Sequence, residues 1–200
     1  AELYREIGVG FQQGGLLGRL SVAENLMFAM EKVRGWHKEE QAARVDRYLH
    51  RVNLWHARGL YPHQISGGMK RRLSIARALC TEPKLILLDN PTAGLDPISS
   101  RQLLKMFDFV MGLDRETSVI CFTSYVEVGT RMANRSIFLH ESRFIFDGIW
   151  RDIFVLDHSF VKEVFMLKFS TYPPDILAKL NIPMAAIQEY QQQEMVKKPS

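Results

Sequence analysis

The sequence contains very little cysteine, and this scarcity argues against two kinds of protein. Only Cys80 and Cys121 occur among the 200 residues, and each lies inside an apolar segment. No histidine or further cysteine stands near them at the spacing of a metal site. The sequence therefore disfavours a disulfide-stabilised secreted domain and a zinc domain, and we expect two buried thiols in a reducing compartment.

Long apolar runs and concentrated positive charge are also lacking. No apolar stretch reaches the roughly 18 residues that a transmembrane helix needs, and the charged start does not fit a signal peptide. The formal net charge is +4, and the charges are scattered rather than gathered on a basic face beside aromatic residues. We therefore expect no nucleic-acid partner, and we expect any membrane role to come through a partner subunit.

What the sequence does contain is a regular alternation of strand and helix patterns. Strands are expected at 5–11, 85–88, 118–123, 136–139 and 144–146, the last two as a hairpin. Helices are expected from Ser21, over 37–52, from Ser66 to about 80, over 98–113 and over 126–133. This order predicts an α/β domain with a mainly parallel sheet.

Two parts of the chain depart from the alternation. Between about residues 20 and 80 the helices follow one another without strands, which predicts a helical lobe. From Asp157 onward the chain is weakly helical, is interrupted by two prolines and ends in a Gln-rich tail. We expect residues 1–157 to form one partial domain and 158–200 to form a C-terminal extension, because this last part is too short and polar to fold alone.

Ser66, Gly67 and Gly68 stand at the start of an expected amphipathic helix. The first turn of a helix has backbone N–H groups without intrahelical partners, and its dipole favours an anion. The tripeptide is therefore a candidate phosphate cradle, although the same three residues also make an ordinary helix N-cap.

Asp89 closes the apolar strand 85–88, and a tight loop from Pro91 to Pro97 follows it. The carboxyl ends of strands are where an open α/β sheet places its ligand-binding groups. A carboxylate at that position can hold Mg²⁺ directly or through water.

In their order, these segments resemble the motifs of ABC-type nucleotide-binding domains. The likeness lies in a signature motif at 65–69, a Walker B strand at 85–89, a D-loop at 93–96 and a Q-loop entry at 11–12. The resemblance extends from about residue 5 to residue 148. It implies a P-loop NTPase-like ABC ATPase core, with a mainly parallel sheet and a helical lobe, that uses ATP and Mg²⁺.

A closer likeness is to the Mla-type (MCE-associated) ATPases of phospholipid trafficking. It lies in residues 11–17, 67–72 and 94–98, and the methionine that follows the two glycines is its most telling feature. This likeness implies that the cargo of the transporter is a lipid.

The family pairs two such domains around two nucleotides, and the resemblance implies which residues face the partner's nucleotide. Ser66, Gly67 and Gly68 would contact its γ-phosphate, with Met69 beside them. Asp96 would communicate across the dimer. The helices between the Q-loop and the signature would contact a transmembrane permease subunit, which places the protein in the cytoplasm, peripheral on the inner face of a membrane.

The resemblance implies a second group of residues at the chain's own nucleotide. Asp89 would organise Mg²⁺, partly through water. Gln12 would sense the metal and the attacking water, and Gln13 is the fallback for that role. No G-x-x-x-x-G-K-[ST] motif occurs in the sequence, so the Walker A cradle for the β- and γ-phosphates is missing. We expect this loop, together with the N-terminal strands of the core, to lie upstream of Ala1, so that the chain is a fragment.

Two positions of the hydrolytic site have residues that the family does not use there. Asn90 replaces the glutamate after Walker B, and an amide cannot act as a general base. Tyr125 follows Ser124 in place of the switch histidine, and a neutral phenol does not reproduce imidazole geometry. The sequence predicts weak or absent hydrolysis at this site, although neutral drift in an active ATPase would give the same residues.

Three functions remain open at this point. The first is an energy-coupling or regulatory ATP-binding subunit of a membrane transporter, in a homodimer or heterodimer. The second is a non-hydrolysing structural subunit whose signature completes the partner's ATP site. The third is a soluble ABC protein without a membrane partner.

Overall fold

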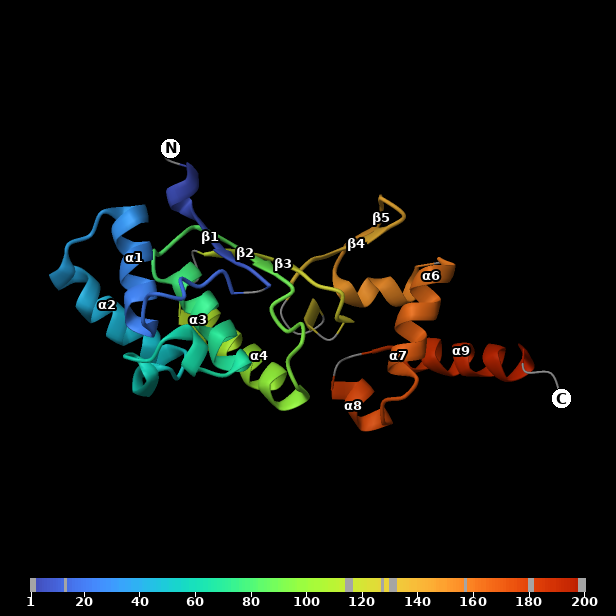
Figure 1. Cartoon of the computed structure of the whole chain (residues 1–200). Helices are drawn as coiled ribbons and strands as arrows, with labels where there is room; N and C mark the ends of the chain where they lie inside the picture. Colours follow the sequence, from blue (N-terminus) through green and yellow to red (C-terminus); the bar gives the residue numbers. More distant parts are fainter. Residues whose placement is uncertain are drawn as a thin grey trace. The chain divides into compact units, whose positions relative to one another are not determined.

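The computed structural model describes residues 3–12, 14–113, 117–126, 128–129, 133–156, 158–179 and 182–197. Within these ranges the chain forms two compact units, residues 1–128 and residues 129–200 (Figure 1). This division follows compactness, whereas the expected boundary after residue 157 separates a family domain from its extension and stays a prediction. No helix of the described part has the length and apolar character that crossing a membrane requires.

The first unit contains a three-stranded parallel sheet, as the alternation of patterns predicts. Its strands are β1 (Ile7–Gly10), β2 (Leu85–Asp89) and β3 (Ser118–Phe122), with β2 in the middle. The expected strand at residues 5–11 is shorter, because Leu3–Glu6 form the 3₁₀ helix η1. The Glu6 carboxylate there accepts a hydrogen bond from Arg34 Nη1 at 3.0 Å, and this bond holds the segment against the C-terminal end of the helix that spans Val22–Arg34.

The helices of the first unit are α1 (Val22–Arg34), α2 (Lys38–Arg51), α3 (Gly67–Leu79) and α4 (Pro97–Leu113), with short 3₁₀ turns at Trp55–Ala57 (η2) and Pro62–Gln64 (η3). The capping box that starts α1 is confirmed: Glu24 N donates to Ser21 Oγ at 3.3 Å, and Ser21 N donates to Glu24 Oε2 at 2.7 Å. Gly35 ends the helix with a φ of 71°.

Helix α3 lies directly against strand β1. A Cβ atom at Gly8 would stand 2.2 Å from the carbonyl oxygen of Ala78, so only glycine permits this approach. The core nearby includes fully buried side chains from α1, α3 and the central strand: Leu26, Met30, Leu73, Ile75, Ile86 and Leu88. Cys80 belongs to the same core and Cys121 is half-buried, and both thiols are free.

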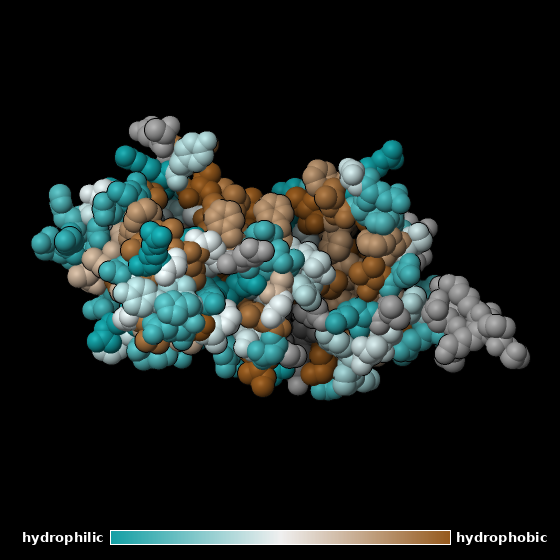
Figure 2. Space-filling model, viewed as in Figure 1, coloured by the Kyte–Doolittle hydropathy of each residue, from teal (hydrophilic) through white to brown (hydrophobic). Residues whose placement is uncertain are grey.

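The two faces of the sheet differ in cover. Ile86 and Leu88 of β2 are buried, whereas the residues that alternate with them are only partly covered. On β3, Ile120 is 47% exposed and Phe122 is 59% exposed. Figure 2 shows hydrophobic side chains gathered over the strands of this unit. The sheet therefore has one covered face and one apolar face open to solvent.

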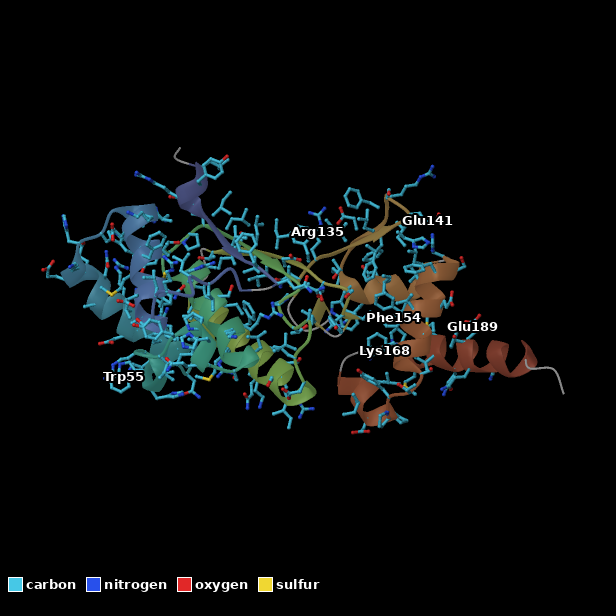
Figure 3. The ribbon with its side chains drawn as sticks, viewed as in Figure 1. Trp55, Arg135, Glu141, Phe154, Lys168 and Glu189 are labelled. Atoms are coloured by element: carbon cyan, nitrogen blue, oxygen red, sulfur yellow. The ribbon has the colours of Figure 1, made fainter. Side chains whose placement is uncertain are left out.

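The second unit begins with the expected hairpin, in which β4 (Ser136–His140) and β5 (Arg143–Gly148) pair antiparallel. Short helical segments follow: η4 (Trp150–Val155), α6 (Ser159–Val161), a π-helical turn (Lys162–Met166), α7 (Leu167–Phe169), α8 (Pro174–Lys179) and α9 (Met184–Lys197). Its core is aromatic, with Phe154 packed against Phe165 and Phe169 (Figure 3). The expected helix at 126–133 lies partly outside the described residues.

Candidate functional site

The polar residues that the sequence singles out gather at the carboxyl edge of the first unit's sheet. The three strands run parallel, so their carboxyl ends meet at one edge. Gln12 follows β1, Asp89 is the last residue of β2, and Tyr125 follows β3. All three are exposed to solvent. Gln13, the fallback for Gln12, lies outside the described residues.

Asn90 continues β2 in a left-handed backbone conformation. Its φ is 46°, a region that asparagine enters more readily than most residues. Its N–H donates to Phe122 O at 2.8 Å, and its carbonyl accepts from Ala93 N at 3.1 Å. The side-chain Oδ1 is buried and finds no hydrogen-bond partner among the described residues. The backbone therefore suits asparagine, and the amide leaves this place without a general base.

Tyr125 lies in the turn that follows β3. Its backbone N–H donates to Thr123 Oγ1 at 3.0 Å, which fixes the turn locally. The residue is 45% exposed. A phenol can donate one hydrogen bond to a phosphate oxygen, but it does not reproduce the geometry of an imidazole.

The signature segment caps helix α3. Ser66 is the N-cap residue, and its Oγ accepts a hydrogen bond from Met69 N at 3.2 Å. A Cβ atom at Gly67 would meet nothing within 4 Å, so the backbone of the first turn is open on that side. The ordinary N-cap role is confirmed, and the role as a phosphate cradle is compatible with it and stays a prediction.

Asp96 has a local structural role that the sequence did not predict. Its Oδ1 accepts hydrogen bonds from Ile98 N at 3.0 Å and Ser99 N at 2.9 Å, so it caps the start of α4. A hydrogen bond with the Ser99 side chain, followed by the backbone bonds of Ser99 and Ile98, lowers the pKa of the Asp96 carboxyl. Its expected role across a dimer stays a prediction.

Two arginines of α3 form hydrogen bonds with the loops that border the site, and no sequence pattern predicts either contact. Arg77 donates to the carbonyl oxygens of Gly14, at 3.3 Å, and of Gly15, which follow the expected Q-loop entry. Arg71 Nη2 donates to Ala93 O at 2.7 Å, in the loop after Walker B. Burial lowers the pKa of both guanidinium groups, and the charge of Asp89 opposes this effect at Arg71.

The residues at the edge fit a magnesium nucleotide only in part. No group of three or more His, Cys, Asp or Glu side chains within the described residues could hold a metal ion by itself. Asp89 is exposed and is a hard oxygen ligand, so it fits an Mg²⁺ ion that takes its other ligands from water and phosphate. The cradle for the phosphates of that same nucleotide is not among the 200 residues.

The chain is similar in sequence and in fold to known ATP-binding proteins. Residues 1–93 match the family model described as "ABC transporter". A solved dimeric ATP-binding cassette, MJ0796 bound to ADP and Pi, superposes with a TM-score of 0.65 and 30% identity, over 75% of this chain and 66% of that one. The chain is similar to ABC transporter ATP-binding domains, in sequence over residues 1–93 and in fold over three quarters of its length. The expected fold class is thereby confirmed, and cbiO1 from Clostridium perfringens agrees with it (TM-score 0.69, 26% identity, 90% of this chain and 68% of that chain).

The curated proteins that this chain resembles are ATP-binding proteins of amino-acid transport. The chain is 37% identical over 155 residues, 76% of its length, to the methionine import ATP-binding protein MetN of Caulobacter vibrioides, of which it covers 46%. It is 32% identical over 199 residues, 98% of its length, to MetN of Streptococcus agalactiae, of which it covers 51%. With the glutamine transport protein GlnQ of Escherichia coli it shares 35% over 144 residues, 72% of this chain and 59% of GlnQ.

The chain therefore spans about half the length of the methionine-import relatives it matches. These relatives are named for methionine import or glutamine transport, and they do not support the closer likeness to phospholipid-trafficking ATPases.

Proposed function

We propose that this chain belongs to the ATP-binding, energy-coupling or regulatory subunit of an ABC import system. In this proposal it pairs with a second ABC ATPase and with a transmembrane permease, at the inner face of a membrane. The observation that supports it most is the joint position of Gln12, Asp89 and Tyr125 at one sheet edge. The names of the relatives favour an amino acid as cargo, whereas a phospholipid cargo rests on the sequence motifs alone.

The residues of this chain divide into two tasks. ATP with Mg²⁺, when bound, supplies the phosphoanhydride bond that is cleaved. Asp89 would hold the metal through its carboxylate, and Gln12 would bind near the metal and the attacking water. The exposed first turn of α3, from Ser66 to Gly68, offers its N–H groups to the γ-phosphate of a nucleotide on the partner.

The weak step in this chain is proton removal from the attacking water. Asn90 cannot accept that proton, and Tyr125 is not the imidazole that the family uses at its position, so we expect hydrolysis at the chain's own site to be slow. Loss of a general base costs on the order of 10²–10⁴ in rate. The intact signature is then of most use to the partner's nucleotide.

Single-turnover and steady-state ATP hydrolysis by the intact protein in its transporter complex test this proposal. We expect slow turnover at the chain's own site and an increase of about 10² or more in Asn90→Glu. The matched control is Asn90→Gln, which has the length of glutamate but no carboxylate and should stay slow. A fast wild-type site that Asp89→Ala abolishes would show an active ATPase in which Asn90 and Tyr125 arose by neutral drift.

A structural subunit is the second candidate, because the chain combines an intact signature segment with substitutions at Asn90 and Tyr125. In that case Gly67→Asp would stop hydrolysis in the partner by placing a carboxylate against its γ-phosphate. Asp89→Ala would leave the partner's rate unchanged. The two candidates therefore differ in whether any ATP is hydrolysed in a complex whose partner site has been inactivated.

A further inference from the structure

Arg71 connects two segments of the first unit that the family resemblance treats separately. It stands on α3, one turn after the signature residues Ser66 to Gly68. Its Nη2 donates to Ala93 O at 2.7 Å, across 22 residues of sequence. Ala93 in turn donates its N–H to Asn90 O at 3.1 Å, which closes the turn that directly follows Asp89.

The surroundings of Arg71 show why a guanidinium is needed there. The group is half-buried, and its Nη1 is buried without a hydrogen-bond partner in the part of the chain that the structure describes. Burial lowers the pKa of Arg71, and the nearby charge of Asp89 favours the charged form. The planar guanidinium can donate to Ala93 O through one nitrogen while its positive charge attracts the Asp89 carboxylate. A lysine offers only one compact, strongly hydrated charge.

A second approach links the same two segments. A Cβ atom at Gly68 would lie 3.5 Å from Ser99 Oγ, so the signature turn lies close to the first turn of α4. Asp96 holds that first turn through Ile98 N and Ser99 N. The start of α3 therefore approaches the β2–α4 loop at Ala93 and the first turn of α4 at Ser99. Among the described residues, Arg71 supplies the one charged hydrogen bond between α3 and this loop.

We propose that Arg71 is a positioning residue that couples the signature segment to the β2–α4 loop of the same chain. Movement of α3 when Ser66 to Gly68 engage the partner's nucleotide passes through Arg71 to Ala93. It thereby shifts the turn that holds Asp89 and Asn90. This coupling rests on the proposed function, because it joins the site completed for the partner with the chain's own metal-binding edge.

The first arm of the test measures amide hydrogen exchange in the intact protein without nucleotide. We expect Arg71→Met to raise exchange in residues 90–96 by about tenfold, the effect of losing one hydrogen bond to a charged group. Arg71→Lys should fall between Arg71→Met and wild type. The matched control is Arg101→Met, which removes one positive charge at an exposed position of α4. Unchanged exchange in residues 90–96 of Arg71→Met would overturn the link itself.

The second arm adds Mg²⁺ and a non-hydrolysable ATP analogue to the assembled transporter. In wild type, we expect the analogue to slow exchange in residues 90–96. In Arg71→Met this response should be lost, while the analogue binds with an affinity within about twofold of wild type. A variant that binds the analogue and responds like wild type would overturn the coupling.

The two arms separate this inference from the proposed function. If the assembled protein does not bind the analogue, the proposed function fails, and the first arm still decides whether Arg71 holds the loop. A wild-type complex that binds the analogue without any change in residues 90–96 overturns the coupling and leaves the proposed function standing.

Discussion

At the scale of single residues, Asn90 shows how a substitution can suit the backbone and weaken the chemistry. Its φ of 46° favours a short polar side chain, and its N–H and carbonyl both hold the turn. The sequence revealed the loss of the carboxylate but not this conformation. The backbone at this position favours asparagine, whereas the chemistry favours a carboxylate. A glutamate placed there must therefore adopt a backbone conformation that it enters less readily.

The thiols give a residue-scale prediction about pH. Burial raises the pKa of Cys80 to about 12 and that of Cys121 to about 11, from the ordinary thiol value of 9.0. A thiol whose pKa is raised in the folded state stabilises the fold fully below about pH 9. We expect this contribution to be lost as the pH rises from 9 through 11 and 12.

Two measurements check this expectation. The free energy of unfolding should fall between pH 9 and pH 11 in wild type, and it should fall less in Cys80→Ala. Both thiols should react slowly with a soluble alkylating reagent at pH 8 and rapidly once the protein is unfolded. Rapid labelling of Cys80 in the folded protein at pH 8 would contradict its burial.

At the scale of elements, local signals predicted helices and strands well, and long-range contacts were out of reach. The start of α1 was predictable because Ser21 and Glu24 form their cap within one turn. The bonds that Arg71 and Arg77 make were not predictable, because their partners lie 22 and more than 60 residues away. The Q-loop and Walker B positions were placed at one edge only through the parallel order of strands.

Glycine at position 8 gives a prediction at this scale. We expect Gly8→Ala to lower the free energy of unfolding by about 1–3 kcal/mol or more, because its Cβ would stand 2.2 Å from Ala78 O and force α3 away from β1. Chemical denaturation measures the change. Gly18→Ala is the matched control, since a Cβ there would meet nothing within 4 Å. Equal stabilities of the two variants would show that α3 does not lie as close to β1 as described.

At the scale of the whole molecule, the chain is two compact units, and the candidate site lies within the first. Residue patterns predicted the α/β class of that unit and the hairpin that opens the second. They did not predict a division near residue 128. Compactness depends on which side chains pack together across the chain, and a linear pattern does not contain that information.

The unpaired edge of strand β3 has a consequence for how this chain behaves at high concentration. Strand β3 pairs only with β2 within the described residues, and its other edge presents unpaired backbone groups beside Ile120 and Phe122. Such an edge is a template for adding a strand from another molecule. We expect the 200-residue chain to self-associate as its concentration rises, and Phe122→Lys to suppress this association.

Light scattering over a concentration series tests the expectation, with Leu60→Lys as the control that adds the same charge away from the sheet. Phe122 is already 59% exposed, so the lysine should cost the fold little. Equal scattering by the two variants would show that the chains associate through a surface other than the edge of β3. The exposed strand β3 would then affect the colloidal stability of the chain before it affects catalysis.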